Sequence, residues 1–289
     1  MILHYHIFKN AGSTLCAALS RNFGDNFAQF HSPSHDQRLS GDALLDFVEA
    51  HPHVVAVSSH HLSPPAPTSD SIQFHEVLII RDPMDRIRSM YDFYRRSRIN
   101  NDPLTAEAKR FTLPEFLEFL IETRPYLVMN SQTNVVANAG AAIPSREDLS
   151  RAIGILRRCA VVGVVEDFDL CALEAEHTLR PLFPGLELSY VRENVTPSRP
   201  KDLQARLDEF RKACGDQLYS KLTELNVLDG ELAAAAGLES RQRWQKINDN
   251  LELGRFKMKV QQRSIVRSLT SGLARIRGLW AGTGKSGQA

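Results

Sequence analysis

The sequence has few cysteines and no motif that gathers them around a metal. Four occur among 289 residues, scattered at Cys16, Cys159, Cys171 and Cys214. None belongs to a C-x-x-C pair, and no His/Cys spacing of the kind that binds zinc is present. This usage favours a reducing compartment and small buried thiols over disulfides. We expect no metal among the cofactors of this protein.

The sequence also lacks long apolar runs. No stretch of about 18 apolar residues occurs, and no basic segment or apolar leader precedes the strand-like residues that begin at Ile2. We therefore expect a soluble, cytoplasmic protein. The hydrophobic fraction of 43% in 289 residues is enough to bury a core without metal or disulfide. This length suits one large domain or a domain with an appendage.

The net charge is only +1, but it is unevenly distributed. From Arg241 onward, 11 Lys and Arg residues face only Asp249 and Glu252, a charge of +9 that leaves −8 for the rest of the chain. A mildly acidic body with a basic tail is not typical of a nucleic-acid-binding domain, so we expect no nucleic-acid partner.

Short apolar runs alternate with helical patterns along the chain, as in a parallel sheet covered on both faces. The predicted strands are Ile2–Phe8, His53–Ser59, Val77–Arg81, Cys159–Phe168 and a short one at Leu188–Val191. The predicted helices are Ser13–Asn22, Gly41–Ala50, Pro83–Ser97, Pro114–Glu122, Arg146–Arg158 and Lys201–Leu225. The sequence therefore predicts an α/β domain over residues 1–230.

The remainder, residues 231–289, is expected to be a basic helical extension. Apolar residues recur there at steps of three or four, at Ile265, Leu269, Leu273, Ile276 and Trp280. This basic tail is compatible with a helix docked on the body, with a homodimer contact, with binding of a polyanionic acceptor, or with peripheral contact to an anionic membrane. The terminal GTGKS resembles a phosphate loop, but its glycine spacing fails and no strand precedes it.

The first segment with chemical content is HYHIFKNAGSTL, from His4 to Leu15. It is an apolar strand that passes through a turn into a helix, which directs backbone N–H groups and the positive end of the helix dipole at one point. Gly12 permits close approach of an anion, Ser13 and Thr14 offer hydroxyl donors, and Lys9 offers an ammonium. The lysine precedes the glycine, so this is not the standard P-loop; a plain strand–helix connection is the alternative.

The second segment is EVLIIRDPMDRIRSMYDFY, from Glu76 to Tyr94. Arg81 ends a predicted strand at its carboxyl edge, where open α/β sheets bind ligands, and Ser89 lies about two turns into the following helix. A guanidinium and a hydroxyl so placed suit a second phosphate. The alternative is that Arg81 only pairs with Asp82 or Asp85.

Together the two segments resemble the sulfotransferases that use 3′-phosphoadenosine-5′-phosphosulfate (PAPS), and more narrowly the carbohydrate O-sulfotransferases of the heparan and uronyl 2-O type. The family's His-x-Pro-Lys-x-Gly-Gly/Ala-Thr/Ser loop is matched over His6 to Thr14, with Phe8 in place of proline. Its x-x-Arg-Asp-Pro-x-x-Arg-x-x-Ser-x-Tyr motif is matched by Arg81, Asp82, Pro83, Arg86, Ser89 and Tyr91. Weaker similarities follow at residues 130–140, 161–169 and 193–199, with Asn134 where the family often has arginine.

The resemblance implies a P-loop-NTPase-like three-layer fold, PAPS as co-substrate, and a carbohydrate or glycoconjugate as acceptor. It places the 5′-phosphosulfate on the first turn, which comprises Lys9, Asn10, Ala11, Gly12, Ser13 and Thr14. It places the 3′-phosphate on Arg81 and Ser89, with Arg199 as a further nucleotide-side candidate.

Transfer of a sulfuryl group to a hydroxyl needs a base and stabilisation of the leaving phosphate. Lys9 suits the second task, and histidine is the usual base near neutral pH. His60 and His61 follow the second predicted strand; we take His60 as the first candidate and His61 as the second, with surface loop histidines as the alternative. The rival functions are an ATP-dependent small-molecule kinase and a catalytically silent nucleotide- or glycan-binding module.

Overall fold

The structure is a computed structural model that describes residues 1–34, 37–98, 102–193, 199–247 and 250–282. For residue 250 and residues 271–282 it describes the helical backbone but not the side chains.

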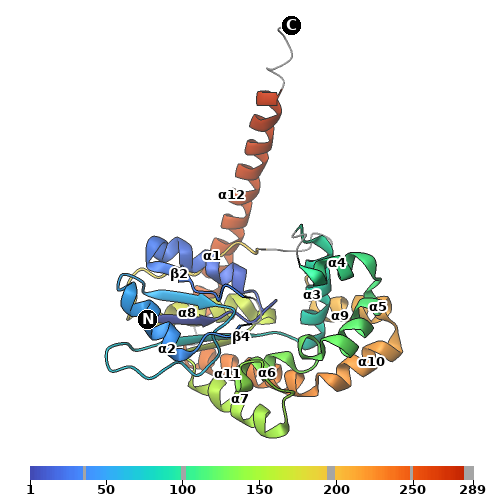
Figure 1. Cartoon of the computed structure of the whole chain (residues 1–289). Helices are drawn as coiled ribbons and strands as arrows, with labels where there is room; N and C mark the ends of the chain where they lie inside the picture. Colours follow the sequence, from blue (N-terminus) through green and yellow to red (C-terminus); the bar gives the residue numbers. More distant parts are fainter. Residues whose placement is uncertain (35–36, 99–101, 194–198, 248–249, 283–289) are drawn as a thin grey trace.

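A five-stranded sheet forms the centre of the molecule (Figure 1). Its order is β2-β3-β1-β4-β5, and every neighbouring pair is parallel. The strands are β1 (Ile2–Tyr5), β2 (Phe27–Gln29), β3 (Ala56–Ser59), β4 (His75–Ile80) and β5 (Val161–Val164). The predicted α/β class with a parallel sheet is confirmed. Because β3, β1 and β4 are adjacent and parallel, the chain leaves all three strands at the same edge of the sheet.

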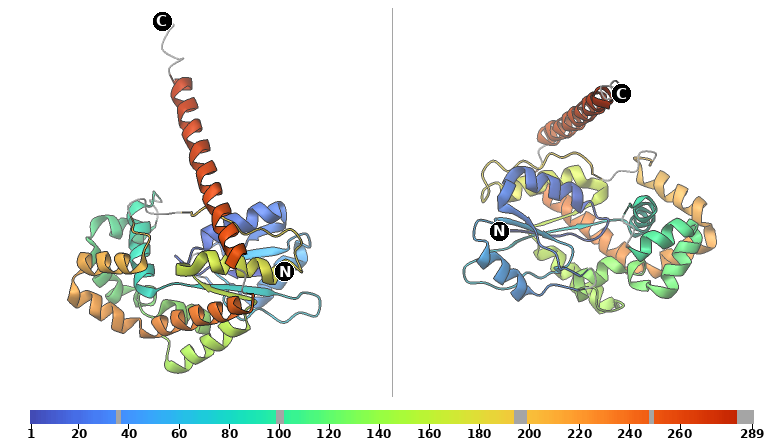
Figure 2. Two further views of the ribbon diagram at one scale, coloured as in Figure 1. Left: turned by 180° about the vertical axis from the view of Figure 1, so that it is seen from behind. Right: turned by 45° about the horizontal axis from the view of Figure 1, so that its top comes forward.

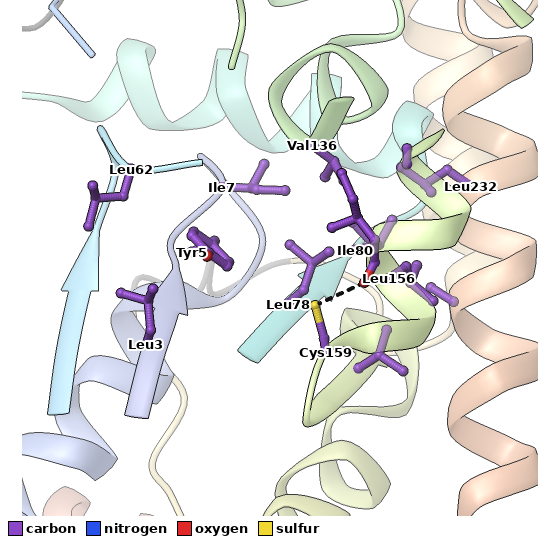
Figure 3. Close-up of a cluster of buried hydrophobic side chains, with 14 of the residues drawn as sticks. Leu3, Tyr5, Ile7, Leu62, Leu78, Ile80, Val136, Leu156, Cys159 and Leu232 are labelled. Carbon is purple, nitrogen blue, oxygen red and sulfur yellow. Dashed lines mark hydrogen bonds between the residues drawn. The ribbon is translucent and has the colours of Figure 1, made fainter. Parts of the chain in front are cut away.

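Helices cover both faces of the sheet, which gives three layers (Figures 1 and 2). One face carries α2 (Gly41–Ala50), α6 (Ser131–Asn138), α7 (Arg146–Arg158) and α11 (Val227–Ile247). The other carries α1 (Gly12–Phe23), α8 (Phe168–Leu179) and the base of α12 (Asn250–Gly282). Leu3, Tyr5 and Ile7 point to the first face and pack in the cluster shown in Figure 3, as strand alternation requires.

A separate helical block lies beside the sheet, on the right of Figure 1. It comprises α3 (Pro83–Arg96), α4 (Pro103–Arg110), α5 (Leu113–Thr123), α9 (Leu203–Cys214) and α10 (Asp216–Leu225), joined by their own apolar core. Helix α3 begins as predicted, with Asp82 capping the backbone N–H of Asp85 at 2.9 Å and Pro83 in the first turn. The single helix predicted over Lys201–Leu225 is wrong, because Gly215 (φ 82°) breaks it into α9 and α10.

The strand predicted at Leu188–Val191 is also wrong. The backbone there bonds to side chains instead of to a neighbouring strand: Arg21 donates to the carbonyl of Ser189 at 2.6 Å. Likewise Glu176 accepts from the N–H of Leu188 at 2.5 Å. Strand β2, by contrast, was not predicted; its three residues are too few for a period-2 pattern. All four cysteines are free and buried, as expected.

The division expected at residue 230 falls inside α11. This helix contributes Leu228, Leu232 and Ala236 to the core beneath the sheet, so the α/β body continues to Ile247. Helix α12 then projects away from the body (Figures 1 and 2). The predicted side chains Leu273, Ile276 and Trp280 lie outside the described residues, as does most of GTGKS. Within the described part of the chain, no helix combines the length and apolar character needed to cross a bilayer.

Candidate active site

The turn after β1 and the end of β4 lie in direct contact. The Arg81 guanidinium donates through Nη1 to the carbonyl oxygen of Lys9 at 2.7 Å, across 72 residues of sequence. A pocket of about 590 Å³ opens above this contact. Its walls include residues from both predicted segments and from the chain near residue 200, namely His6, Phe8, Lys9, Ala11, Gly12, Ser13, Thr14, His60, Arg81, Ser89, Arg199 and Arg206.

Gln132 holds the two strand ends in register. Its Oε1 accepts from Asn10 Nδ2 at 2.7 Å and from the backbone N–H of Arg81 at 2.9 Å. Its Nε2 donates to the Arg81 carbonyl at 2.8 Å. Asp229 of α11, fully buried, accepts in turn from the N–H of Gln132 at 3.0 Å. Asn10, expected to contact the nucleotide, is instead buried beneath the turn, where it also donates to the Ile79 carbonyl at 2.8 Å.

The turn itself has a backbone suited to an anion. Lys9 (φ 69°) and Ala11 (φ 59°) adopt left-handed conformations, which are uncommon for residues with a side chain and concentrate at functional sites. Helix α1 begins at Gly12, and Gly12, Ser13 and Thr14 line the pocket, so the positive N-terminal end of this helix lies at the pocket wall. A side chain at position 12 would require the His6 ring to move, because a Cβ there would lie 1.9 Å from Cδ2 of His6.

Lys9 lies beside two aromatic rings at the pocket wall. Its Nζ is 4.5 Å from the centroid of Phe93 and 5.6 Å from that of Phe8. Burial, reinforced by the positive charges of Arg81, Arg96 and Arg199, lowers the pKa of Lys9 to about 8. A bound anion raises the pKa of Lys9 again, because negative charge favours the protonated ammonium. The pocket therefore favours a ligand that brings negative charge close to Lys9.

Three arginines converge on one carboxylate below the pocket. Asp85 Oδ2 accepts from Arg81 Nε at 2.9 Å and Nη2 at 2.6 Å. Its Oδ1 accepts from Arg199 Nη2 at 2.5 Å and Arg206 Nε at 2.8 Å. Burial alone would raise the pKa of Asp85, but the three guanidinium groups lower it. One carboxylate cannot neutralise three guanidinium groups, so the cluster keeps an excess of positive charge toward the pocket.

Part of this cluster was not predicted from the sequence. Arg206 lies in α9 with no phosphate-binding motif around it, and Asp85 was considered only as a partner that would occupy Arg81. Arg192 and Lys201 also line the pocket, so six cationic side chains face two carboxylates, those of Glu166 and Glu193. Ser89 lines the same pocket, as the sequence predicted.

His60 is the candidate base that reaches the pocket. Its Nδ1 lies 2.7 Å from the backbone carbonyl of His6, and since a carbonyl can only accept, Nδ1 carries the proton. Nε2 of neutral His60 therefore bears the lone pair. Burial, together with the charges of His31, His61 and Arg38, lowers the pKa of His60 to about 4. His60 is thus neutral and able to accept a proton throughout the physiological range.

His61, the second candidate, does not line the pocket. It is buried, and its Nδ1 accepts from the backbone N–H of Ser32 at 3.2 Å. His6, the first residue of the matched loop, also lines the pocket, and its ring lies beside that of His60 with the centroids 3.7 Å apart. Within the described residues, no group of three or more His, Cys, Asp or Glu side chains is arranged to hold a metal ion.

Comparison with known proteins finds a similar sequence but assigns no function. No protein-family model matches the chain. An uncharacterized protein of Archaeoglobus fulgidus is 27% identical over 263 residues, which cover 88% of this chain and 98% of that protein. The similarity covers most of this chain but carries no assigned function, so the chemistry of the pocket is argued from its own residues.

Proposed function

We propose that this protein is a PAPS-dependent sulfotransferase that moves a sulfuryl group to a hydroxyl of a carbohydrate or glycoconjugate. One observation carries the proposal. The helix-N-terminal turn with Lys9, the Arg81–Arg199–Arg206 cluster and a neutral His60 share the same pocket. A nucleotide with two separate phosphate-type groups uses both cationic regions, and a hydroxyl acceptor uses the base.

The proposed roles follow from the contacts. The N–H groups at the start of α1, with Ser13 and Thr14, bind the 5′-phosphosulfate. Arg81, Ser89 and Arg199, joined by Arg206, bind the 3′-phosphate. The aromatic and apolar wall that includes Phe168 and Tyr190 suits the adenine ring.

In the proposed transfer, the acceptor hydroxyl oxygen attacks the sulfur atom and the bond from sulfur to the bridging phosphate oxygen breaks. The hydroxyl proton passes to His60 Nε2, whose other nitrogen is held by the His6 carbonyl. The leaving phosphate gains negative charge, which protonated Lys9 stabilises. The products are a sulfate ester and 3′-phosphoadenosine-5′-phosphate (PAP). The four buried free thiols fit a reducing compartment, and we propose that the reaction takes place in the cytoplasm.

Thermal-shift measurements with PAP, ATP and ADP test the proposal against a kinase. A ligand that binds only the folded protein raises its melting temperature, and at equal ligand concentration the tighter ligand raises it more. We expect PAP to stabilise the protein more than ATP or ADP, with no requirement for magnesium. Stronger stabilisation by magnesium-bound ATP would favour the kinase, and no stabilisation by any of the three would reject a nucleotide site.

A further inference from the structure

Over residues 251–270, whose side chains the structure describes, helix α12 packs against the body through one of its sides. Phe256 is buried among residues of α8 and the segment that follows it, and Val260 packs against the same cluster. One and two turns further on, Arg263 donates to Glu187 at 2.8 Å and Arg267 Nη2 to Glu193 at 3.0 Å. These four positions are spaced by four, three and four residues, so they share one side of the helix.

The opposite side of α12 carries an apolar stripe. Met258, Ile265 and Leu269 are 57%, 52% and 63% exposed, and they too are spaced so as to share one side. At about 100° per residue, Met258 is rotated about 200° from Phe256. The stripe therefore faces away from the body. The helix cannot rotate to bring the stripe onto the body while Phe256 and Arg263 keep their contacts there.

The charged residues that follow Glu252 are all positive. No Asp or Glu follows Glu252, whereas eight cationic residues do, at Arg255, Lys257, Lys259, Arg263, Arg267, Arg275, Arg277 and Lys285. Two copies of α12 packed through their stripes would bring like charges together, because Glu252, the one acidic residue in the sequence of α12, already pairs with His177 and Arg180 of the body. The partner that fits an apolar stripe flanked by cations is one that supplies both anions and an apolar interior.

We infer that α12 is a docking surface for an anionic lipid bilayer, with the stripe of Met258, Ile265 and Leu269 inserted at the headgroup boundary. Amphipathic helices rich in Lys and Arg bind such surfaces through buried apolar area and attraction to anionic headgroups. The projecting position of α12 in Figure 2 leaves this side accessible. The inference does not depend on the chemistry of the pocket.

Co-sedimentation of the full chain with vesicles tests the inference. We expect binding to vesicles that contain phosphatidylglycerol, weaker binding to phosphatidylcholine alone, and loss of binding at high salt. The double variant Ile265→Glu/Leu269→Glu should reduce partitioning about tenfold or more. Its matched control is Leu238→Glu, which alters a side chain of α11 that is equally exposed (54%) but lies on the body.

Each outcome of the vesicle experiment either supports or overturns membrane docking by α12. Binding that the double variant abolishes and Leu238→Glu preserves supports the inference. Absence of binding to anionic vesicles overturns it, as does binding that the double variant leaves unchanged. Self-association of the wild-type chain that the double variant abolishes, without vesicle binding, would assign the stripe to a second copy instead. Melting curves of all variants confirm that each is folded.

Discussion

The guanidinium of Arg81 donates to the backbone carbonyl of Lys9 at 2.7 Å. Arg81 therefore has two tasks: it fixes the turn after β1, and it belongs to the cationic cluster around Asp85. Together with the hydrogen bonds of Asn10 and Gln132, this contact joins the two segments from which the nucleotide site is built. Substitutions at and around it should separate structural from functional effects.

Asp85→Asn should destabilise the protein by about 3 kcal/mol, because it leaves three guanidinium groups without their shared carboxylate. The loss is measured by urea denaturation at pH 7. Asp208→Asn is the matched control, since Asp208 is exposed, accepts a hydrogen bond from the exposed Gln204, and should change stability by less than about 0.5 kcal/mol when substituted.

Asp85→Asn should also change how the free energy of unfolding depends on pH. The pKa of Asp85 is lowered in the folded protein, so its contribution is present above its unfolded pKa and is lost as the pH falls through the folded value. Wild-type stability should therefore decline below about pH 4, and the decline should be shallower in Asp85→Asn. Equal slopes would mean that Asp85 does not titrate with folding.

His60→Ala should reduce turnover about a hundredfold or more, whereas His61→Ala should leave the chemical step nearly unchanged. His60 lines the pocket with a fixed tautomer, and His61 points to Ser32 outside it. Turnover is followed with radiolabelled sulfuryl donor after an acceptor screen. Near-normal turnover in His60→Ala would remove this residue from the role of base.

The pH dependence of kcat/KM should be bell-shaped. His60 must be neutral, and its pKa of about 4 places the acid limb there, well below that of an ordinary histidine. Lys9 must be protonated, and its pKa of about 8 places the alkaline limb there. Lys9→Arg should move the alkaline limb upward because arginine stays protonated. An alkaline limb that does not move would assign it to another group.

Gly12→Ala should destabilise the protein by about 1–3 kcal/mol and displace the His6 ring, because the new Cβ would lie 1.9 Å from that ring. The control is Gly154→Ala in α7, where the nearest atom is 3.8 Å away and the change should stabilise the helix by up to about 1 kcal/mol. If both variants are equally stable in urea denaturation, the close packing of His6 on Gly12 is not maintained.

Local patterns were enough to predict the strand–turn–helix segments around Gly12 and Arg81. Each depends on signals within about ten residues, such as a buried strand, a glycine, or the Asp82–Pro83 helix start. They also place Lys9, Arg81 and Ser89 at the edge of the sheet where the pocket lies. Local patterns could not predict the contacts of residues whose partners lie far away in the sequence.

Gln132 and Asn10 illustrate that limit. Nothing near Gln132 in the sequence indicates that its amide bonds to Asn10 and to both backbone groups of Arg81. For the same reason Asn10 was assigned to the ligand although its side chain points into the core. His60 and His61 could not be separated by sequence, because their difference lies in the carbonyl of His6 and the N–H of Ser32.

The most direct test of the account is calorimetric titration of PAP and of adenosine 5′-phosphate into wild-type protein and Arg81→Ala. If Arg81 binds the 3′-phosphate, wild-type protein prefers PAP about tenfold or more, and Arg81→Ala removes most of that preference. Equal affinity of wild-type protein for both ligands, or a preference that survives in Arg81→Ala, would contradict the assignment of the two phosphate groups to this pocket.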